Sequence, residues 1–251
     1  MTGRNLLKLN VSSLMGWISL AVPFMAQAES VESPPLKAGD SWVYQYTVET
    51  GSSGWTKTRN ELAVNRVTAA NLYLSTKQSG STQNVREFVI GADWGRLRAV
   101  NGKETVVARP LKFPMTIGQS WELQYTEQKP PNSRNKYETH NTKYVVVGRE
   151  DVEVPAGKFS ALKIEAEGTW QAEAEPVSRV VQGAESTQGN TTMISQVQNS
   201  AGMVSTGRTY KAYWYVPEVR RWVKSVEEYY TSNGTRNERY AEELESYKLK
   251  D

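Results

Sequence analysis

Large aromatic and apolar side chains recur at every second position along much of this chain. Trp42, Tyr44 and Tyr46 alternate with other residues, and Tyr144–Val147 is a short run of residue types that favour strands. Because successive side chains of a β-strand point to opposite faces of a sheet, a period of two places the aromatic residues together on one face. The pattern predicts that residues 36–251 fold mainly as strands.

Short turn signals separate these alternating runs. Asn101-Gly102 and Asn233-Gly234 each lie between two strand-like runs, and both dipeptides tolerate the positive φ of a tight hairpin. In Val154–Gly157, proline occupies the second position and glycine the fourth, as a type I turn prefers. The predicted fold class is therefore all-β, a curved antiparallel sheet or an open β-barrel that is built from hairpins.

Two segments are compatible with more than one local structure. Residues 171–209 are rich in Gln, Ser, Thr, Asn and Gly, which is typical of a loop or of a long, solvated, polar hairpin. Strand-like stretches within this segment favour the hairpin. Residues 237–250 contain many Glu and could form a helix, but the Asn-Gly turn just before them favours a final strand.

One motif occurs twice in the chain. Residues 35–47 align with residues 114–126, and Gly, Ser, Trp, Gln, Tyr and Thr coincide at the same offsets. We interpret each copy as a turn that leads into a strand. Because two copies are too few for a solenoid, the repeat predicts a single β domain, residues 36–251, made of two related halves, 36–113 and 114–251.

The N-terminal residues have the three parts of a secretory signal. Arg4 and Lys8 carry positive charge, residues 11–25 are mostly apolar, and Ala26–Ala28 has small residues at the two positions that a signal peptidase reads. The apolar part is shorter than the ~20 residues that a spanning helix needs. We therefore expect residues 1–28 to be a signal peptide that is cleaved after Ala28. The product would be periplasmic or secreted, without an integral membrane segment.

Composition limits the partners and the chemistry of the remaining chain. Loss of Arg4 and Lys8 with the signal reduces the 30 basic residues to 28, against 27 acidic residues, so no surface for nucleic acid is expected. Cysteine is absent, which excludes disulfides, thiol chemistry and a lipid on a processed N-terminal cysteine. Residues 29–35 are polar and end in two prolines, and we interpret them as a flexible lead-in.

Few side chains of the types that catalyse reactions are present. His140 is the only histidine, so neither a histidine-based triad nor a zinc or copper site is expected, and no cofactor motif occurs. Glu165 and Glu167 share one face of an expected strand and could act as a pair on a sugar. We expect a protein that is not an enzyme, with a carboxylate-dependent polysaccharide hydrolase as an alternative.

Aromatic residues are the unusual component of the chain. Seven of the eight tryptophans and all thirteen tyrosines follow residue 28. Such side chains either fill a β core or line a cleft that holds a sugar or an acyl chain, and for the tryptophans we favour the core. The side chains that we predict to line such a cleft are Trp42, Tyr44, Tyr46, Trp121, Tyr125, Trp170 and Trp214.

Three sequence blocks resemble a known protein family. Residues 152–165 read V-E-V-P-A-G-K-F-S-A-L-K-I-E, and residues 213–224 read Y-W-Y-V-P-E-V-R-R-W-V-K. Together with residues 36–42, they are similar to proteins of the bacterial envelope that share a domain of unknown function. The resemblance implies a curved antiparallel sheet or an open β-barrel, similar to the folds of periplasmic lipoprotein carriers. It carries over no catalytic residue.

The function predicted from these observations is noncatalytic binding in the periplasm. The expected ligand of this carrier-type protein is a lipid or another amphiphile. The alternative is a structural or interaction protein of the envelope, which would bind a protein partner through sheet edges and exposed aromatic residues. The polysaccharide hydrolase is the further alternative.

Overall fold

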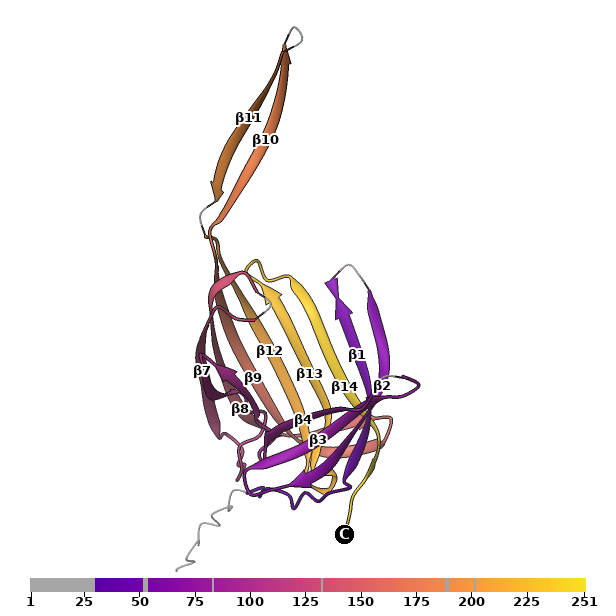
Figure 1. Ribbon diagram of the computed structural model, residues 1–251. Coiled ribbons are helices and arrows are strands. Elements are labelled where there is room, and N and C mark those ends of the chain that lie inside the picture. Colours follow the sequence, from indigo (N-terminus) through magenta and orange to yellow (C-terminus); the bar gives the residue numbers. More distant parts are fainter. Residues whose placement is uncertain (1–29, 52–53, 83, 132, 188–189, 201) are drawn as a thin grey trace, which may run out of the picture.

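The chain folds almost entirely into β-strands (Figure 1). The computed structural model describes residues 30–251 except 52–53, 83, 132, 188–189 and 201. The predicted signal peptide, residues 1–28, and its cleavage site lie outside the described residues. The strands are β1 (Ser41–Thr50), β2 (Trp55–Val67), β3 (Asn71–Gln78), β4 (Arg86–Gly91), β5 (Arg96–Val100), β6 (Lys103–Ala108), β7 (Ser120–Gln128), β8 (Asn135–Val154), β9 (Gly157–Ala174), β10 (Val177–Thr187), β11 (Asn190–Ser200), β12 (Val204–Val216), β13 (Arg221–Thr231) and β14 (Arg236–Lys248).

Ten of the strands form one antiparallel sheet in the order β4-β3-β2-β1-β14-β13-β12-β9-β8-β7. Most neighbours follow each other along the chain, and the exceptions are β1 beside β14 and β9 beside β12. The register shifts opposite Val43/Tyr44 of β1, where β14 has an extra residue, and opposite Trp214/Tyr215 of β12, where β13 has one. Such bulges bend a strand. The sheet curves without closing, and its edges are β4 and β7. The predicted curved antiparallel sheet of hairpins is therefore confirmed.

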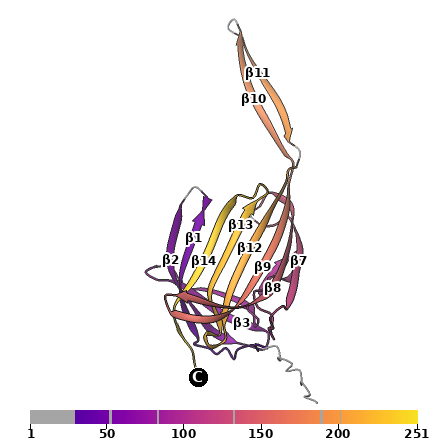
Figure 2. The same ribbon diagram turned by 180° about the vertical axis from the view of Figure 1, so that it is seen from behind.

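The polar stretch 171–209 divides between the main sheet and a separate ribbon. β9 runs on to Ala174 and β12 starts at Val204, so the two ends of the stretch belong to the main sheet. Between them, β10 and β11 pair only with each other, in antiparallel orientation. Figures 1 and 2 show from opposite sides that this ribbon projects beyond the end of the main sheet.

A second small hairpin, β5–β6, lies against the edge strand β7. Asn101 and Gly102 form its turn with φ of 51° and 77°, the left-handed region that these residue types tolerate. The Asn101 side chain donates to the Thr126 carbonyl at 2.8 Å and accepts from the Gln128 N–H at 2.7 Å. These bonds satisfy backbone groups of an edge strand, which would otherwise be open to another chain.

The two copies of the repeated motif form matching turns. Gly39 (φ 93°) and Gly118 (φ 86°) occupy the left-handed region, which a residue without Cβ adopts without strain. The next side chains, Asp40 and Gln119, each accept a hydrogen bond from the backbone N–H three residues earlier, at 3.0 and 3.1 Å. Their surroundings differ, because Asp40 is fully buried whereas Gln119 is partly exposed.

A buried ion pair joins the start of the sheet to the corner between β12 and β13. Pro217–Val219 forms a 3-10 turn at this corner, and Arg220 follows it with φ of 62°. Arg220 Nη1 lies 3.1 Å from Asp40 Oδ2, and Asp40 Oδ1 accepts from the Lys250 N–H at 2.7 Å. The last segment of the chain forms strand β14, as the Asn233-Gly234 turn before it predicts. This segment ends beside the start of β1.

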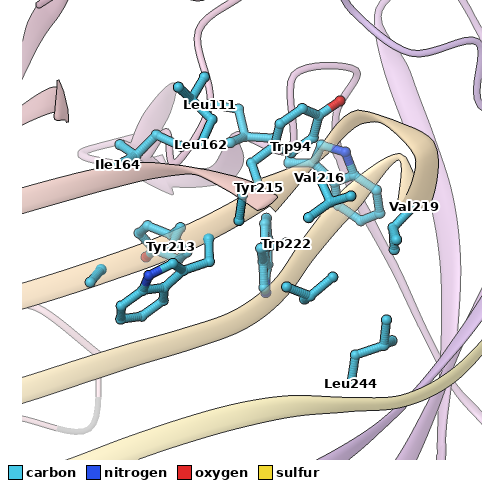
Figure 3. Close-up of a cluster of buried hydrophobic side chains, with 14 of the residues drawn as sticks. Trp94, Leu111, Leu162, Ile164, Tyr213, Tyr215, Val216, Val219, Trp222 and Leu244 are labelled. Atoms are coloured by element: carbon cyan, nitrogen blue, oxygen red, sulfur yellow. The ribbon is translucent and has the colours of Figure 1, made fainter. Parts of the chain in front are cut away.

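The core lies on one face of the main sheet, which we call the core face. Trp42 of β1, Tyr213 of β12 and Leu244 of β14 are buried there. The chain between β4 and β7 covers this face and contributes Trp94 and Leu111, which are buried as well. Figure 3 shows these two side chains beside residues of β12 and β13. Burial of each large apolar side chain contributes about 1.5–3 kcal/mol, which allows a stable core without disulfides.

Candidate functional site

Four aromatic rings meet edge to face in the middle of the core face. The Trp94 ring centroid lies 5.5 Å from that of Trp42 and 5.6 Å from that of Trp222. The Trp222 and Tyr213 centroids are 5.3 Å apart. Trp42 Nε1 also donates to the Val219 carbonyl at 2.8 Å. Because aromatic rings prefer edge contacts at these separations, the four side chains form a well-packed wall, which we call the aromatic wall.

Arg221 lies against the aromatic wall with only 6% of its surface exposed. Its guanidinium carbon is 4.1 Å from the Trp222 centroid, 4.5 Å from that of Tyr44 and 5.1 Å from that of Trp94. At these distances a cation is attracted to a ring face. The carboxylate paired with Arg221 is Glu242, 3.6 Å from Nη2. The side chain is thus a buried cation surrounded mainly by aromatic rings.

Tyr44 lies next to the aromatic wall. Its hydroxyl donates to the Trp222 carbonyl at 2.6 Å. Burial raises the pKa of the Tyr44 phenol well above its ordinary value, and the positive charge of Arg221 offsets this only in part. The phenol is therefore neutral at physiological pH.

A hollow of about 250 Å³ lies beside Arg221 on the core face, and we call it the apolar hollow. Strands β2, β3 and β4 supply most of its wall. Its lining includes Leu62, Leu74, Phe88, Ile90, Trp94 and Arg221. Phe88 belongs to the edge strand β4 and is 37% exposed, so the apolar hollow reaches the molecular surface there.

A second hollow, of about 440 Å³, adjoins the first, because Trp222 and Glu242 line both. We call it the tyrosine hollow. Its other lining residues include Tyr46, Tyr213, Glu227, Tyr229, Glu238 and Tyr240. The Tyr46 and Tyr240 rings stack with centroids 6.3 Å apart, and Tyr229 meets Tyr240 edge to face at 5.9 Å. Apolar walls and a cluster of hydroxyls and carboxylates therefore lie side by side on the core face.

Glu227 is the centre of the hydrogen bonds in the tyrosine hollow. It accepts from Lys211 at 2.8 Å, from Tyr213 at 3.0 Å and from Tyr229 at 3.1 Å. Burial alone would raise the pKa of Glu227, but the Lys211 ammonium and these hydrogen bonds outweigh it and hold the pKa below its ordinary value. Burial, together with the charge of Glu227, raises the pKa of Tyr213 well above 10.0. At neutral pH the hollow combines an ionised carboxylate with neutral phenols.

The seven aromatic residues predicted to line a ligand site are spread over the sheet. Tyr44 lines the apolar hollow, and Tyr46 lines the tyrosine hollow. Trp42 is fully buried within the aromatic wall. Trp121 is buried on the edge strand β7, where its ring stacks on Tyr144 with centroids 5.3 Å apart.

The remaining three line neither of the two hollows. Tyr125 stacks on His140 with centroids 4.8 Å apart, and Trp170 is the register partner of His140 on the neighbouring strand. Trp214 follows Tyr213 in β12 and therefore points to the opposite face of the sheet. There its ring lies 5.4 and 5.7 Å from two lysine ammonium groups. The structure thus brings Tyr44 and Tyr46 to adjoining hollows and leaves the other five residues elsewhere.

The carboxylates considered for catalysis, Glu165 and Glu167, lie on the opposite face of the sheet. They line an open trough of about 1030 Å³. Glu165 pairs with Lys163 at 3.0 Å and accepts from the Tyr210 hydroxyl at 2.9 Å. Burial alone would raise the pKa of Glu165, but these two partners hold the pKa below its ordinary value. Glu165 is therefore ionised at neutral pH.

Sequence reasoning missed most residues of the two hollows. A signal for the tyrosine hollow does exist, because Glu227 and Tyr229 alternate on one strand and the Asn-Gly turn brings Tyr240 back beside them. Arg221 had no such signal. The neighbouring Arg220 has the same chemistry, and only the fold directs Arg220 to a buried carboxylate and Arg221 to the aromatic wall.

Neither a metal centre nor a spanning helix occurs in the described part of the chain. Its residues include no group of three or more His, Cys, Asp or Glu side chains placed to hold a metal ion. They also include no helix with the length and apolar character needed to cross a membrane.

Two solved structures are similar to this chain. A protein of Parabacteroides distasonis, provisionally named a lipoprotein, is 14% identical with a TM-score of 0.47, over 88% of this chain and 100% of that chain. A protein of Bacteroides fragilis, provisionally named an exported protein with a YmcC-like fold, is 17% identical with a TM-score of 0.37, over 87% and 99%. No protein-family model and no curated protein matches the sequence. Membership of the envelope family that the sequence blocks resemble therefore stays a prediction.

Proposed function

We propose that this protein, released into the periplasm by cleavage after Ala28, binds an amphiphile on its core face without catalysing a reaction. The observation that carries this proposal is the junction of the apolar hollow with the tyrosine hollow at Trp222 and Glu242. An amphiphile has one apolar part and one polar part, and each hollow suits one of them. Their volumes, about 250 and 440 Å³, are near the lower end of the range usual for small-molecule sites.

Access to the apolar hollow supports a carrier role. The hollow borders the edge strand β4, and Phe88 in its wall is partly exposed. A ligand can therefore enter at the edge of the sheet without separating paired strands, whose backbone hydrogen bonds would be costly to break. Exchange of the ligand with a membrane or another carrier would use the same edge.

The environment of Glu165 limits the role that this residue could have in polysaccharide hydrolysis. A glycosidase needs one carboxylic acid whose pKa is raised, so that it can protonate the leaving group. The partners of Glu165 lower its pKa instead. In a catalytic pair Glu165 would therefore be the nucleophile or the base, and Glu167 would have to be the proton donor.

Interaction with an envelope protein is the second candidate function. The β10–β11 ribbon projects beyond the main sheet, as Figure 1 shows, and the edge strand β4 carries the exposed residues Phe88 and Val89. An open edge and a projecting hairpin can both pair with another chain. Removal of residues 177–200 should abolish a crosslinked partner in envelope extracts if this candidate is correct, and an unchanged crosslinking pattern would contradict it.

A fluorescence experiment tests amphiphile binding. Trp94 and Trp222 line the apolar hollow, so a brominated fatty acid bound there should quench tryptophan fluorescence, whereas its unbrominated counterpart should not. Asn60 also lines this hollow, and an Asn60→Phe variant should reduce the affinity because the new ring occupies the space. Glu61 is exposed and points to the other face of β2, so Glu61→Phe is the matched control. Equal quenching in both variants would contradict the proposal, as would an absence of saturable quenching in the wild-type protein.

A further inference from the structure

Two side chains that line the apolar hollow carry buried hydrogen-bond donors without an acceptor. Nε and Nη1 of Arg221 and Nε1 of Trp94 are shielded from solvent and have no hydrogen-bond acceptor among the described residues. Both side chains line the apolar hollow. Buried donors are nearly always paired in folded proteins, because an unpaired one destabilises the fold. Three unpaired donors in one place therefore indicate an acceptor that the protein itself does not provide.

Glu242 does not fill this role. Its carboxylate already accepts from Trp222 Nε1 at 2.8 Å and from Ser225 Oγ at 3.2 Å. The Arg221 Nη2 atom is 3.6 Å from Glu242, which is beyond hydrogen-bond distance. The pair partly balances the charge of the guanidinium but leaves Nε and Nη1 without an acceptor.

The aromatic rings around Arg221 also leave its donors available. Ring faces attract the flat side of a guanidinium, whereas its N–H groups lie in the plane of the guanidinium. The rings of Trp222 and Tyr44 therefore attract the guanidinium, while its Nε and Nη1 atoms remain without a hydrogen-bond acceptor among the described residues. An anionic oxygen in the apolar hollow, which Arg221 lines, would accept charge-assisted hydrogen bonds from these donors.

We propose that Arg221, with Trp94, binds the anionic group of a single-chain amphiphile, a carboxylate or a phosphate, whose chain lies against Leu62, Leu74 and Ile90. This inference rests on the proposed amphiphile binding and adds the sign of the charge on the ligand. The buried guanidinium supplies the complementary charge. The apolar side chains in the same hollow supply the contacts for the chain.

Calorimetric titration with two ligands of equal chain length, dodecanoate and dodecanol, tests the proposal. The wild-type protein should bind dodecanoate at least about tenfold more tightly than dodecanol, as charge-assisted hydrogen bonds imply. An Arg221→Met variant should lose this preference while it still binds dodecanol. Lys224→Met removes a charge from the same strand on the opposite face, where Lys224 pairs with Glu243, and it should retain the preference.

An additional variant and additional ligands distinguish the possible reasons for a negative result. Arg221→Met leaves Glu242 without its cation, so the double variant Arg221→Met/Glu242→Gln repeats the test with no unpaired charge. Equal affinity of the wild-type protein for dodecanoate and dodecanol would overturn this inference and leave the proposed function standing. Binding of neither ligand would overturn both. Dodecyl phosphate should bind much more tightly than inorganic phosphate, and equal affinity for the two would show an anion site without a chain and overturn the proposal.

Discussion

Replacement of Asp40 by alanine is expected to destabilise the fold strongly, although Asp40 lies outside both hollows. Its carboxylate is fully buried and accepts from the backbone N–H groups of Lys37 at 3.0 Å and Lys250 at 2.7 Å. It also pairs with Arg220 at 3.1 Å. One side chain therefore joins the turn before β1, the end of the chain and the corner between β12 and β13.

The size of the effect follows from these contacts. Removal of one partner of a buried ion pair typically costs about 3–5 kcal/mol, because the other charge is left uncompensated. The Arg220 side chain retains 17% exposure and also donates to the Lys250 carbonyl at 3.1 Å, so we expect the lower end, about 3 kcal/mol. Gln119→Ala in the matching turn removes a hydrogen bond from a partly exposed side chain and should cost about 1 kcal/mol.

Urea unfolding, followed by tryptophan fluorescence and circular dichroism, measures both values. The unfolding midpoint of Asp40→Ala should fall well below that of Gln119→Ala, with similar slopes for the two variants. Asp40→Asn keeps an acceptor oxygen and should recover part of the loss. Equal midpoints for Asp40→Ala and Gln119→Ala would contradict this prediction, because the two turns would then contribute equally to stability despite the buried ion pair.

Three further predictions concern pH and packing. Burial raises the pKa of Tyr213 well above 10.0, so the native state holds this proton more tightly than the unfolded state and stability falls as the pH rises above 10.0. A Tyr213→Phe variant should therefore lose less unfolding free energy than the wild-type protein as the pH rises above 10.0, and an equal loss in the two proteins would contradict this. The pKa of Glu227 lies below 4.5, so its contribution is complete above 4.5 and is lost as the pH falls through the native pKa. Glu227→Gln should therefore destabilise the protein at pH ~7 but less in acid, and an equal loss of unfolding free energy at every pH would count against the assignment. A methyl group at Gly207 would collide with the Trp170 indole, so Gly207→Ala should lower the free energy of unfolding by about 1–3 kcal/mol in thermal unfolding. As a control, replacement of the exposed Ser205 by alanine should change stability by less than about 0.5 kcal/mol. Similar losses for the two variants would argue against the predicted collision.

The local structure of this protein could be predicted from its sequence, because alternation and turn chemistry act over a few residues. Asn101-Gly102 illustrates this, since both residues adopt the positive φ that the dipeptide predicts. The order of strands could not be predicted in the same way. Ser41 pairs with Lys248 across nearly the whole chain, and such a distant pairing depends on packing rather than on any local sequence signal.

In the candidate site, too, the local sequence predicts some features, and packing against distant segments determines others. Trp42, Tyr44 and Tyr46 share the core face, as their spacing predicts. The spacing does not show which of them is covered. The chain between β4 and β7 places Trp94 against Trp42, whereas Tyr46 remains at the wall of the tyrosine hollow. The burial of each aromatic side chain therefore depends on a segment that is distant in sequence.

The central claim is that an amphiphile binds on the core face, and native mass spectrometry tests it most directly. The protein would be purified from periplasm without detergent and measured before and after extraction with organic solvent. We expect the mass of residues 29–251 with an additional mass that the solvent releases, and a weaker signal of this kind in Asn60→Phe than in Glu61→Phe. A bare mass in both conditions, from a protein that also fails to take up dodecanoate, would show that no amphiphile binds on the core face.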